Sequence, residues 1–270
     1  MKITFLGGGN MANALIGGMV KQGYAAADIT VIDPGAEARA KLGESYGVRC
    51  VEAASVLDAV GDLLVLAVKP QQMKEAVAPL AGKLGQAVVV SIAAGLDLAA
   101  LSRFLGGHRK IVRCMPNTPA LIGAGITGLC ALPEVDEAGC AAADRVLSAV
   151  GSTLWIADEG KMDGVTAISG SGPAYVFLFI EALQQAAADL GFTAEQGRQL
   201  AIETVQGAAA LAAQSSEPAA VLRERVTSKG GTTEAALRTM GERGVKEGII
   251  AGVMAAEARG AELGKLLGAA

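Results

Sequence analysis

Two glycine-rich turns carry residue types suited to binding anions. The first is the run Gly7 to Ala12, Gly-Gly-Gly-Asn-Met-Ala, near the start of the 270-residue chain. Gly7, Gly9 and Ala12 fit the spacing G-x-G-x-x-G/A, in which the glycines allow a tight turn close to a pyrophosphate and the small residue packs helix on strand. A plain strand-to-helix turn can use the same residues. The context favours dinucleotide binding, because an apolar run precedes the turn and Asp33 ends the next one about 20 residues on.

The second turn is Ser228 to Thr233, Ser-Lys-Gly-Gly-Thr-Thr, before a predicted helix in the last part of the chain. Its two glycines expose backbone N–H groups at a helix start, where unpaired donors and the helix dipole favour a carboxylate or phosphate. Ser228 and Thr233 add hydroxyl groups. A glycine turn with a threonine N-cap would have the same spacing. Beside a dinucleotide-binding domain, the anion site is the favoured interpretation.

The first half of the chain alternates apolar and helical segments, which predicts a doubly wound parallel sheet, an α/β Rossmann-like fold. Expected strands cover Ile3 to Leu6, Ile29 to Ile32, Asp62 to Val68 and Ala87 to Ile92, and expected helices cover Asn10 to Gln22, Ala36 to Tyr46 and Gln71 to Leu84. Ligands of such sheets bind outside the carboxyl ends of the strands. We therefore predict that one crevice gathers the cofactor-binding residues Gly7, Gly8, Gly9, Asn10, Met11, Asp33, Ala67, Val68, Lys69, Pro70, Ala93 and Ala94.

A proline-containing loop follows the expected short strand Lys110 to Val112. It runs from Arg113 to Pro119 and contains two prolines, which stiffen it. The loop can hold Asn117 and Thr118 at fixed positions by the crevice, and Asn117 joins the predicted cofactor-binding residues. A rigid connection without a binding role fits the same sequence.

From about residue 160 the sequence predicts only helices, so the expected domains are 1–159, a dinucleotide-binding domain, and 160–270, an all-α domain. Expected helices cover Ala194 to Ala213, Pro218 to Val226, the segment from the second turn to Met240, and Val245 to Leu267. The first long helix contains Ser169 to Tyr175, Ser-Gly-Ser-Gly-Pro-Ala-Tyr. Glycines and a proline inside a helical pattern predict a kink or very close packing.

Composition narrows the possible functions. The net charge is −4, with a sequence pI of about 5.2 and no basic patch, which argues against a nucleic-acid partner. The four cysteines form no C-x-x-C pair and do not cluster with His108, which argues against a metal site or disulfides and fits a reducing cytoplasm. No signal peptide is recognised, and the apolar run Ala174 to Ile180 ends at Glu181, short of a membrane span. Since 51% of the residues are hydrophobic, we expect an apolar face buried in another subunit.

Two other reactive side chains are expected to be structural. His108 lies in a polar turn, which favours a solvated surface position. Cys114 lies within the proline-containing loop and is expected to be a small packed residue.

Five motifs together resemble the pyrroline-5-carboxylate reductase family. They are Phe5 to Ala12, Ala67 to Pro70, Arg113 to Pro119, Ser169 to Tyr175 and Ser228 to Thr233, in the family's order across nearly the whole chain. The resemblance implies NAD(P)H-dependent reduction of 1-pyrroline-5-carboxylate to L-proline, the last step of proline biosynthesis. It also implies a homodimer through the helical domain, sometimes built into larger rings, with the substrate loop beside the nicotinamide.

The substrate, a cyclic imine with a carboxylate, suggests roles for the second turn. The substrate-binding residues are predicted to be Ser228, Gly230, Gly231, Thr232 and Thr233. The Thr233 hydroxyl is the predicted catalytic group, hydrogen-bonded to the ring nitrogen. Because a threonine is too weak an acid to deliver the proton unaided, we expect solvent or a relay to supply it.

The residues after the second strand and the family resemblance favour different cofactors. Asp33 at the end of the second strand favours the ribose 2′-OH of NAD(H). Family members often carry an arginine at the next position, where this chain has Pro34, and the nearest cations, Arg39 and Lys41, lie further along the helix. The resemblance favours NADP(H), and NAD(H) stays open.

Two alternatives remain at this stage. A related imine or β-hydroxyacid reductase would normally show a catalytic lysine or aspartate at the kinked helix, and Ser169 to Gly172 offers neither. A non-catalytic NAD(P)-binding sensor would bind the cofactor without turnover.

Overall fold

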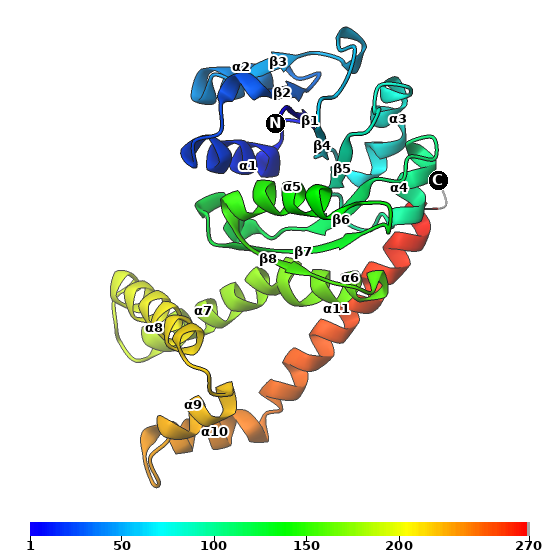
Figure 1. Ribbon diagram of the computed structural model, residues 1–270. Helices are drawn as coiled ribbons and strands as arrows, with labels where there is room; N and C mark the ends of the chain where they lie inside the picture. The colour runs from blue at the N-terminus through cyan, green and yellow to red at the C-terminus, as the bar shows by residue number, and fades with distance from the viewer. Residues whose placement is uncertain (269–270) are drawn as a thin grey trace. The chain divides into compact units, whose positions relative to one another are not determined.

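A mixed eight-stranded sheet forms the centre of the first half of the molecule (Figure 1). The computed structural model describes residues 1–268. The strands are β1 (Ile3–Leu6), β2 (Ile29–Ile32), β3 (Arg49–Val51), β4 (Leu63–Leu66), β5 (Val88–Ser91), β6 (Ile111–Met115), β7 (Gly125–Ala131) and β8 (Gly151–Trp155). Their order is β3-β2-β1-β4-β5-β6-β7-β8, and only the β6/β7 pair is antiparallel within the described residues. The predicted α/β fold is confirmed.

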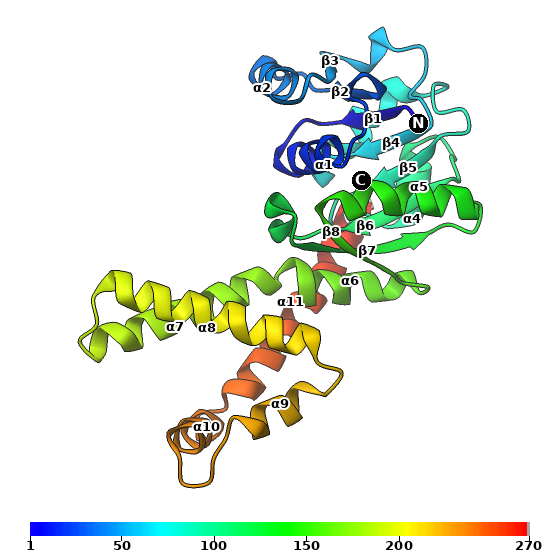
Figure 2. The same cartoon turned by 60° about the vertical axis from the view of Figure 1, so that its left-hand side comes forward.

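Helices cover both faces of the sheet (Figures 1 and 2). One face packs on α1 (Asn10–Lys21), α2 (Ala36–Tyr46) and α5 (Glu137–Leu147), and the other on α3 (Met73–Val77), α4 (Leu98–Phe104) and α6 (Met162–Val165). The central strands are apolar on both sides, as parallel strands between two helical layers must be. In β1, for example, Phe5 packs toward the first face and Leu6 toward the second.

Three predicted details of this half were wrong. The expected helix Gln71 to Leu84 is broken into short pieces, a 3-10 turn (Pro70–Gln72), α3 and a second 3-10 turn (Ala78–Leu80). Pro79 lies at the start of that second turn and has no N–H to continue a helix. The sequence prediction also missed β3, which has only three residues, and α4, which has seven. Such short segments show too little periodicity to be recognised.

The remaining helices belong to the C-terminal half. They are α7 (Gly172–Asp189), α8 (Ala194–Gln214), α9 (Ala219–Arg225), α10 (Thr232–Glu242) and α11 (Val245–Gly268). Between α6 and α7 the chain forms a π-helix over Thr166–Gly170, in which the Ser171 N–H donates to the Thr166 carbonyl at 2.8 Å. A Cβ on Gly170 would lie 2.7 Å from Met115 Cε. Of the two predicted alternatives, a kink or very close packing, the contact at Gly170 confirms the close packing.

The structure forms two compact units by internal packing, and the expected domains 1–159 and 160–270 stay a prediction. One unit is Met1–Ser171 together with the chain from Ala256 onward, and the other is Gly172–Ala255. Met162 of α6 is fully buried in the core of the first unit. The end of α11 also packs there, since a Cβ on Gly264 would lie 3.1 Å from the Gly95 carbonyl oxygen.

Helix α7 leaves large apolar side chains uncovered within the single chain. By length and composition, Glu159–Asp189 is the segment of residues 1–268 that would be able to cross a membrane, because an 18-residue window in it has a mean hydropathy of 1.3. Only 6% of its most apolar window is buried. The exposed side chains include Val176, Phe177, Leu178 and Phe179.

Substitution of two helical glycines by alanine tests how closely α1 packs against its neighbours. A Cβ on Gly18 of α1 would overlap the carbonyl oxygen of Ala149, whereas a Cβ on Gly43 of α2 would approach nothing closer than the Val48 carbonyl oxygen at 3.9 Å. We expect Gly18→Ala to lower the free energy of unfolding by about 1–3 kcal/mol through overpacking. Gly43→Ala, the control, should leave it unchanged or raise it by up to about 1 kcal/mol. Urea denaturation of both variants measures this, and equal stabilities would contradict the packing described.

Candidate active site

The loops that follow β1, β2, β4 and β5, which carry most of the predicted cofactor-binding residues, lie at one edge of the sheet. In the strand register Leu6 is opposite both Ile32 and Leu66, and Leu66 is opposite Ser91. The segments that follow β1, β2, β4 and β5 therefore leave the sheet at the same edge. The strand order also reverses between β1 and β4, which makes this edge the point where open α/β sheets bind ligands.

The glycine turn after β1 has the geometry that its spacing predicts. Gly7 has a φ of +101°, and a Cβ there would lie 2.7 Å from the Ala67 carbonyl oxygen, so only glycine fits. Ala12, the small residue of the motif, is fully buried between helix and sheet. The turn is therefore held tightly against the loop that follows β4.

Helix α1 begins with unpaired backbone donors. Gly9 is its N-cap, with no side-chain cap, and the first bond of the helix runs from the Asn13 N–H to the Gly9 carbonyl at 2.9 Å. The N–H groups of Asn10 and Met11 precede that bond and have no intrahelical acceptor. A Cβ on Gly9 would meet no atom within 4 Å, so the space before these donors is open. This arrangement suits a phosphate group.

Asp33 supports the glycine turn from the end of β2. Its Oδ2 accepts a hydrogen bond from the Gly8 N–H at 2.7 Å, and its Oδ1 accepts one from the Gly35 N–H at 2.7 Å. Gly8 was predicted to bind the cofactor, but its N–H donates to the Asp33 carboxylate instead. The Asp33 carboxylate is half-buried, and both of its oxygens already have a partner.

The loops after β4 and β5 complete this edge. Lys69 is exposed, whereas Val68 and Pro70 are half-buried. Ala93 is buried and Ala94 is exposed. These residues lie where the sequence predicted them, with small or apolar groups close to the sheet and one cation in solvent.

Asn117 forms hydrogen bonds within the protein from the loop after β6. Its Nδ2 donates to the Ser169 carbonyl at 3.2 Å, and its Oδ1 accepts from the Ile126 N–H at 2.9 Å. The side chain is buried and connects the proline-containing loop to the π-helix. A direct contact between Asn117 and a cofactor stays a prediction.

Sequence reasoning missed a buried ion-pair cluster around Arg113 of β6. Its Nη1 lies 3.1 Å from Glu159 Oε1 and its Nη2 lies 3.3 Å from Asp163 Oδ1. Glu159 Oε1 also accepts a hydrogen bond from the Leu98 N–H at 2.7 Å. The cluster fixes the strand that leads into the proline-containing loop. An arginine within an otherwise apolar strand was the signal in the sequence.

The second group of predicted residues, Ser228 to Thr233, belongs to the other compact unit. Gly231 is the N-cap of α10, with no side-chain cap, and the first bond of the helix runs from Ala235 N–H to the Gly231 carbonyl. The N–H groups of Thr232 and Thr233 precede that bond and have no intrahelical acceptor. The start of α10 thus repeats the arrangement found at the start of α1.

Two predicted donors of this loop are engaged within it. The Gly231 N–H donates to the Ser228 carbonyl at 3.0 Å, and the Gly230 N–H donates to Glu234 Oε2 at 2.7 Å. Gly230 has a φ of +73°, which favours glycine. Glu234, the third residue of α10, was not predicted, although a glutamate at this position commonly reaches back to a preceding N–H.

The two other reactive side chains have structural surroundings. A ring nitrogen of His108 lies 2.9 Å from the Ala87 carbonyl oxygen, and the ring is half-buried instead of fully solvated. Cys114 is buried, and burial raises the pKa of its thiol well above the usual value. The thiol therefore stays protonated at neutral pH, as expected for a packed residue.

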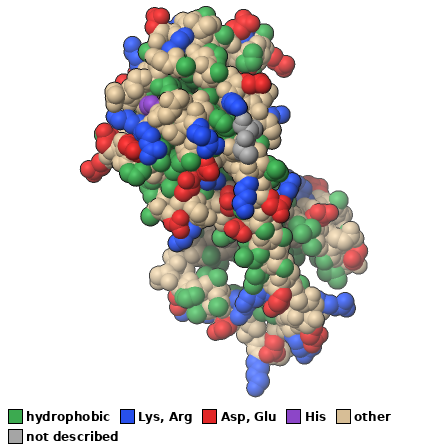
Figure 3. Space-filling view, turned by 90° about the vertical axis from the view of Figure 1, so that its right-hand side faces the viewer, with side chains coloured by type: hydrophobic (Ala, Val, Ile, Leu, Met, Phe, Trp, Pro, Cys, Tyr) green, Lys and Arg blue, Asp and Glu red, His purple; other side chains and the backbone are tan. Residues whose placement is uncertain are grey.

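On the face drawn in Figure 3, basic and acidic side chains are interspersed.

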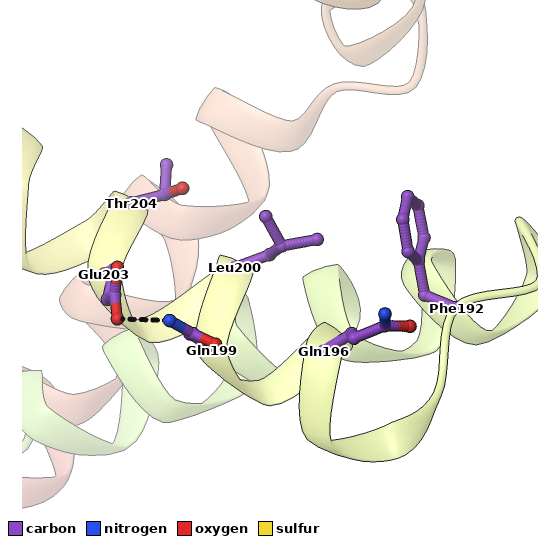
Figure 4. Close-up of a pocket in the computed structure, with 6 residues that line it drawn as sticks. All are labelled: Phe192, Gln196, Gln199, Leu200, Glu203 and Thr204. Atoms are coloured by element: carbon purple, nitrogen blue, oxygen red, sulfur yellow. Dashed lines mark hydrogen bonds between the residues drawn. The ribbon is translucent and has the colours of Figure 1, made fainter.

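A cavity of about 550 Å³ lies beside α8 and contains none of the predicted residues. Figure 4 shows its lining, in which Phe192 and Leu200 project to the same side and Gln199 Nε2 donates to Glu203 Oε1 at 3.0 Å. Its lining side chains include a carboxylate and no lysine or arginine. The cavity is therefore a poor site for the anionic ligands that the two helix starts suit.

Comparisons with known proteins give one consistent result. A family model described as pyrroline-5-carboxylate reductase dimerisation matches residues 159–263, and one described as NADP oxidoreductase, coenzyme F420-dependent, matches residues 2–95. The pyrroline-5-carboxylate reductase of Pseudomonas aeruginosa is 46% identical over 268 residues, covering 99% of this chain and 98% of that protein.

Solved structures agree with the sequence relatives. A pyrroline-5-carboxylate reductase from Coxiella burnetii has a TM-score of 0.91 and 38% identity, covering 97% of this chain and 98% of that one. The Plasmodium falciparum pyrroline carboxylate reductase, solved with NADP bound, has a TM-score of 0.87 and 28% identity, covering 98% of both chains.

The Glu234 contact can be tested by proteolysis, because Lys229 places a trypsin site in the exposed loop. Glu234→Ala removes the acceptor of the Gly230 N–H, so we expect cleavage after Lys229 to become several-fold faster. Glu234→Gln keeps an oxygen acceptor and should cleave at nearly the original rate. Glu242→Ala, at the other end of α10, is the control. Equal cleavage rates for all four proteins would show that the contact does not order the loop.

Proposed function

We propose a binding geometry for this chain from the premise that it belongs to the pyrroline-5-carboxylate reductase family. It is an NAD(P)H-dependent oxidoreductase that acts on a C=N bond and reduces 1-pyrroline-5-carboxylate to L-proline, the last step of proline biosynthesis. A reductase of other substrates and a non-catalytic sensor are not favoured. The observation that carries the proposed geometry is the pair of helix starts with unpaired donors, one in each compact unit.

The residues of the first unit fit a dinucleotide. The N–H groups of Asn10 and Met11 would hold the pyrophosphate, and the absence of a Cβ at Gly9 leaves room for it. The loops containing Lys69 and Ala94 would line the nicotinamide half of the crevice. The bound cofactor supplies the hydride. Between the two nucleotides we favour NADP(H), and the name of one family model and the NADP bound to the Plasmodium enzyme support that preference.

The start of α10 would hold the substrate. Its carboxylate can accept hydrogen bonds from the Thr232 and Thr233 N–H groups, with the exposed Ser228 hydroxyl as a further donor. The glycines at 230 and 231 shape this loop, since their own N–H groups bond to Glu234 and Ser228. The chain therefore fixes the carboxylate by backbone groups whose positions depend on the loop fold.

Thr233 is the proposed catalytic residue. Its side chain is half-buried at the second position of α10, next to the donors for the carboxylate. A hydroxyl hydrogen-bonded to the ring nitrogen would orient the imine, and protonation of that nitrogen makes the adjacent carbon electrophilic. Because a threonine hydroxyl is a weak acid, the proton would come from solvent or a relay. The main contribution of Thr233 would be orientation of the substrate.

Substitutions of the two neighbouring threonines separate side-chain from backbone roles. Thr233→Ala should lower kcat at least about tenfold and leave the affinity for NADPH nearly unchanged, because it removes only the hydroxyl at the substrate. Thr233→Ser should retain most of the turnover. Thr232→Ala keeps its backbone N–H and is the control, expected near the original kcat. Steady-state kinetics with 1-pyrroline-5-carboxylate measure this, and unchanged turnover in Thr233→Ala would exclude the proposed role.

The chain carries the dimerisation domain of its family, and we propose a homodimer formed through it. The exposed apolar side chains of α7 support this, because monomeric proteins rarely leave such a contiguous apolar surface in water. Assembly of dimers into a larger ring is compatible with the same surface. A cytoplasmic location, without a membrane or nucleic-acid partner, is part of the proposal, and four unpaired cysteines suit that compartment.

Leu178 of α7 tests the proposed interface. Its side chain is 67% exposed in the single chain, and Val56, on the first unit, is 59% exposed. A buried carboxylate in an apolar interface is costly, so Leu178→Asp should convert the assembly to monomers at micromolar concentration. Val56→Asp, the control, should keep the original mass. Sedimentation velocity measures both, and an unchanged mass for Leu178→Asp would contradict an interface on this part of α7.

A further inference from the structure

The side chain of Arg39 reaches back to the turn that follows β2. Although Arg39 lies in the first turns of α2, its Nη1 donates to the carbonyl oxygens of Asp33 and Pro34, both at 2.8 Å. The guanidinium therefore lies at the edge of the sheet where the ribose of a dinucleotide binds in this fold. The Arg39 backbone lies further along the helix, as expected from the sequence, and its long side chain spans the distance back to the turn.

The guanidinium keeps donors for a ligand. Its two carbonyl bonds use only Nη1, and in residues 1–268 neither Nε nor Nη2 has a recorded hydrogen-bond partner. No carboxylate forms an ion pair with Arg39 in the same part of the chain. An arginine fixed at one nitrogen and free at the others is prepared for a bidentate contact with a phosphate.

The turn also contains an acidic group, Asp33, whose charge opposes the binding of an anionic ligand. Burial raises the pKa of the Cys50 thiol, the Arg39 charge lowers it and the Asp33 carboxylate raises it, so both charges lie near the end of β3. Asp33 would repel a phosphate, but its two oxygens are directed to the Gly8 and Gly35 N–H groups. Glu37 and Lys41 of α2 are both exposed and of opposite sign.

The start of α2 supplies further donors beside Arg39. Its N-cap is Gly35, without a side-chain cap, and the first bond of the helix runs from the Arg39 N–H to the Gly35 carbonyl at 3.1 Å. The N–H group of Ala36 precedes that bond and has no intrahelical acceptor. A helix start and an unpaired guanidinium therefore adjoin the same turn, which is the combination that phosphate groups prefer.

We propose that Arg39 binds the 2′-phosphate of NADP(H) and replaces the arginine that family members often carry directly after the second strand. The proposal rests on the proposed cofactor site and deepens it, because it names the residue that distinguishes NADP(H) from NAD(H). Pro34 occupies the position of the missing arginine, and its carbonyl instead helps to hold the Arg39 guanidinium. Asp33 then acts mainly as a support of the glycine turn.

Calorimetric binding of NADP⁺ and NAD⁺ to the full-length protein tests this without any turnover. We expect Arg39→Ala to weaken NADP⁺ binding at least about tenfold, as for a lost hydrogen bond to a charged group, and to change NAD⁺ binding less than about twofold. Arg39→Lys keeps the charge but not the fork of donors and should fall between. Lys41→Ala removes the neighbouring exposed cation and should change neither affinity by more than about twofold.

Two results would overturn the proposal. An equal loss of NADP⁺ and NAD⁺ affinity in Arg39→Ala would mean that Arg39 only supports the turn, and an unchanged NADP⁺ affinity would mean that another group binds the phosphate. The melting temperature of each variant shows whether the fold is kept. Turnover of 1-pyrroline-5-carboxylate by the unmodified protein tests the proposed function separately, so the two failures are distinguishable.

Discussion

The first N–H groups of a helix have no acceptor within the helix, and this constraint shapes both predicted binding turns. Helices α4, α5 and α8 begin with side-chain caps from Asp97, Asp136 and Thr193, which satisfy a donor of the first turn. The N-caps of α1 and α10 are Gly9 and Gly231, which provide no side-chain acceptor. We propose that the cofactor and substrate anions complete these two helix starts, because donors that leave water without an acceptor cost stability. In this proposal the glycines give up a local capping bond and leave the first donors of each helix available to a ligand.

The rest of the first unit places one of these helix starts. Parallel register brings the ends of β1, β2, β4 and β5 to the same edge, and buried apolar side chains on both faces keep the strands in that register. Close contacts at Gly7 and the two hydrogen bonds of Asp33 then fix the turn itself. The Arg113 cluster fixes the neighbouring loop in the same way. Packing and polar contacts thus determine where backbone donors point.

Much of this was predictable from the sequence, because strong periodicity and glycine spacing report local geometry. The helix Ala36–Tyr46, the close packing at Gly170 and the two glycine turns were found at the right residues. Short segments such as β3 were missed because three residues carry too little pattern. The hydrogen bonds that long side chains form with preceding loops were also not predictable. Arg39 donates to the turn after β2 and Glu234 accepts from the Gly230 N–H, although both residues lie in helices. Such contacts depend on rotamers and on neighbours that only the fold brings together.

The central claim is that the glycine-capped start of α10 holds the substrate carboxylate. A crystal structure with NADP⁺ and L-proline tests it most directly, since the product carries the same carboxylate as the substrate. We expect carboxylate oxygens within about 3 Å of the Thr232 and Thr233 backbone nitrogens, with the Thr233 hydroxyl toward the ring nitrogen. A product carboxylate bound by other groups, with the start of α10 facing only water, would exclude this carboxylate site.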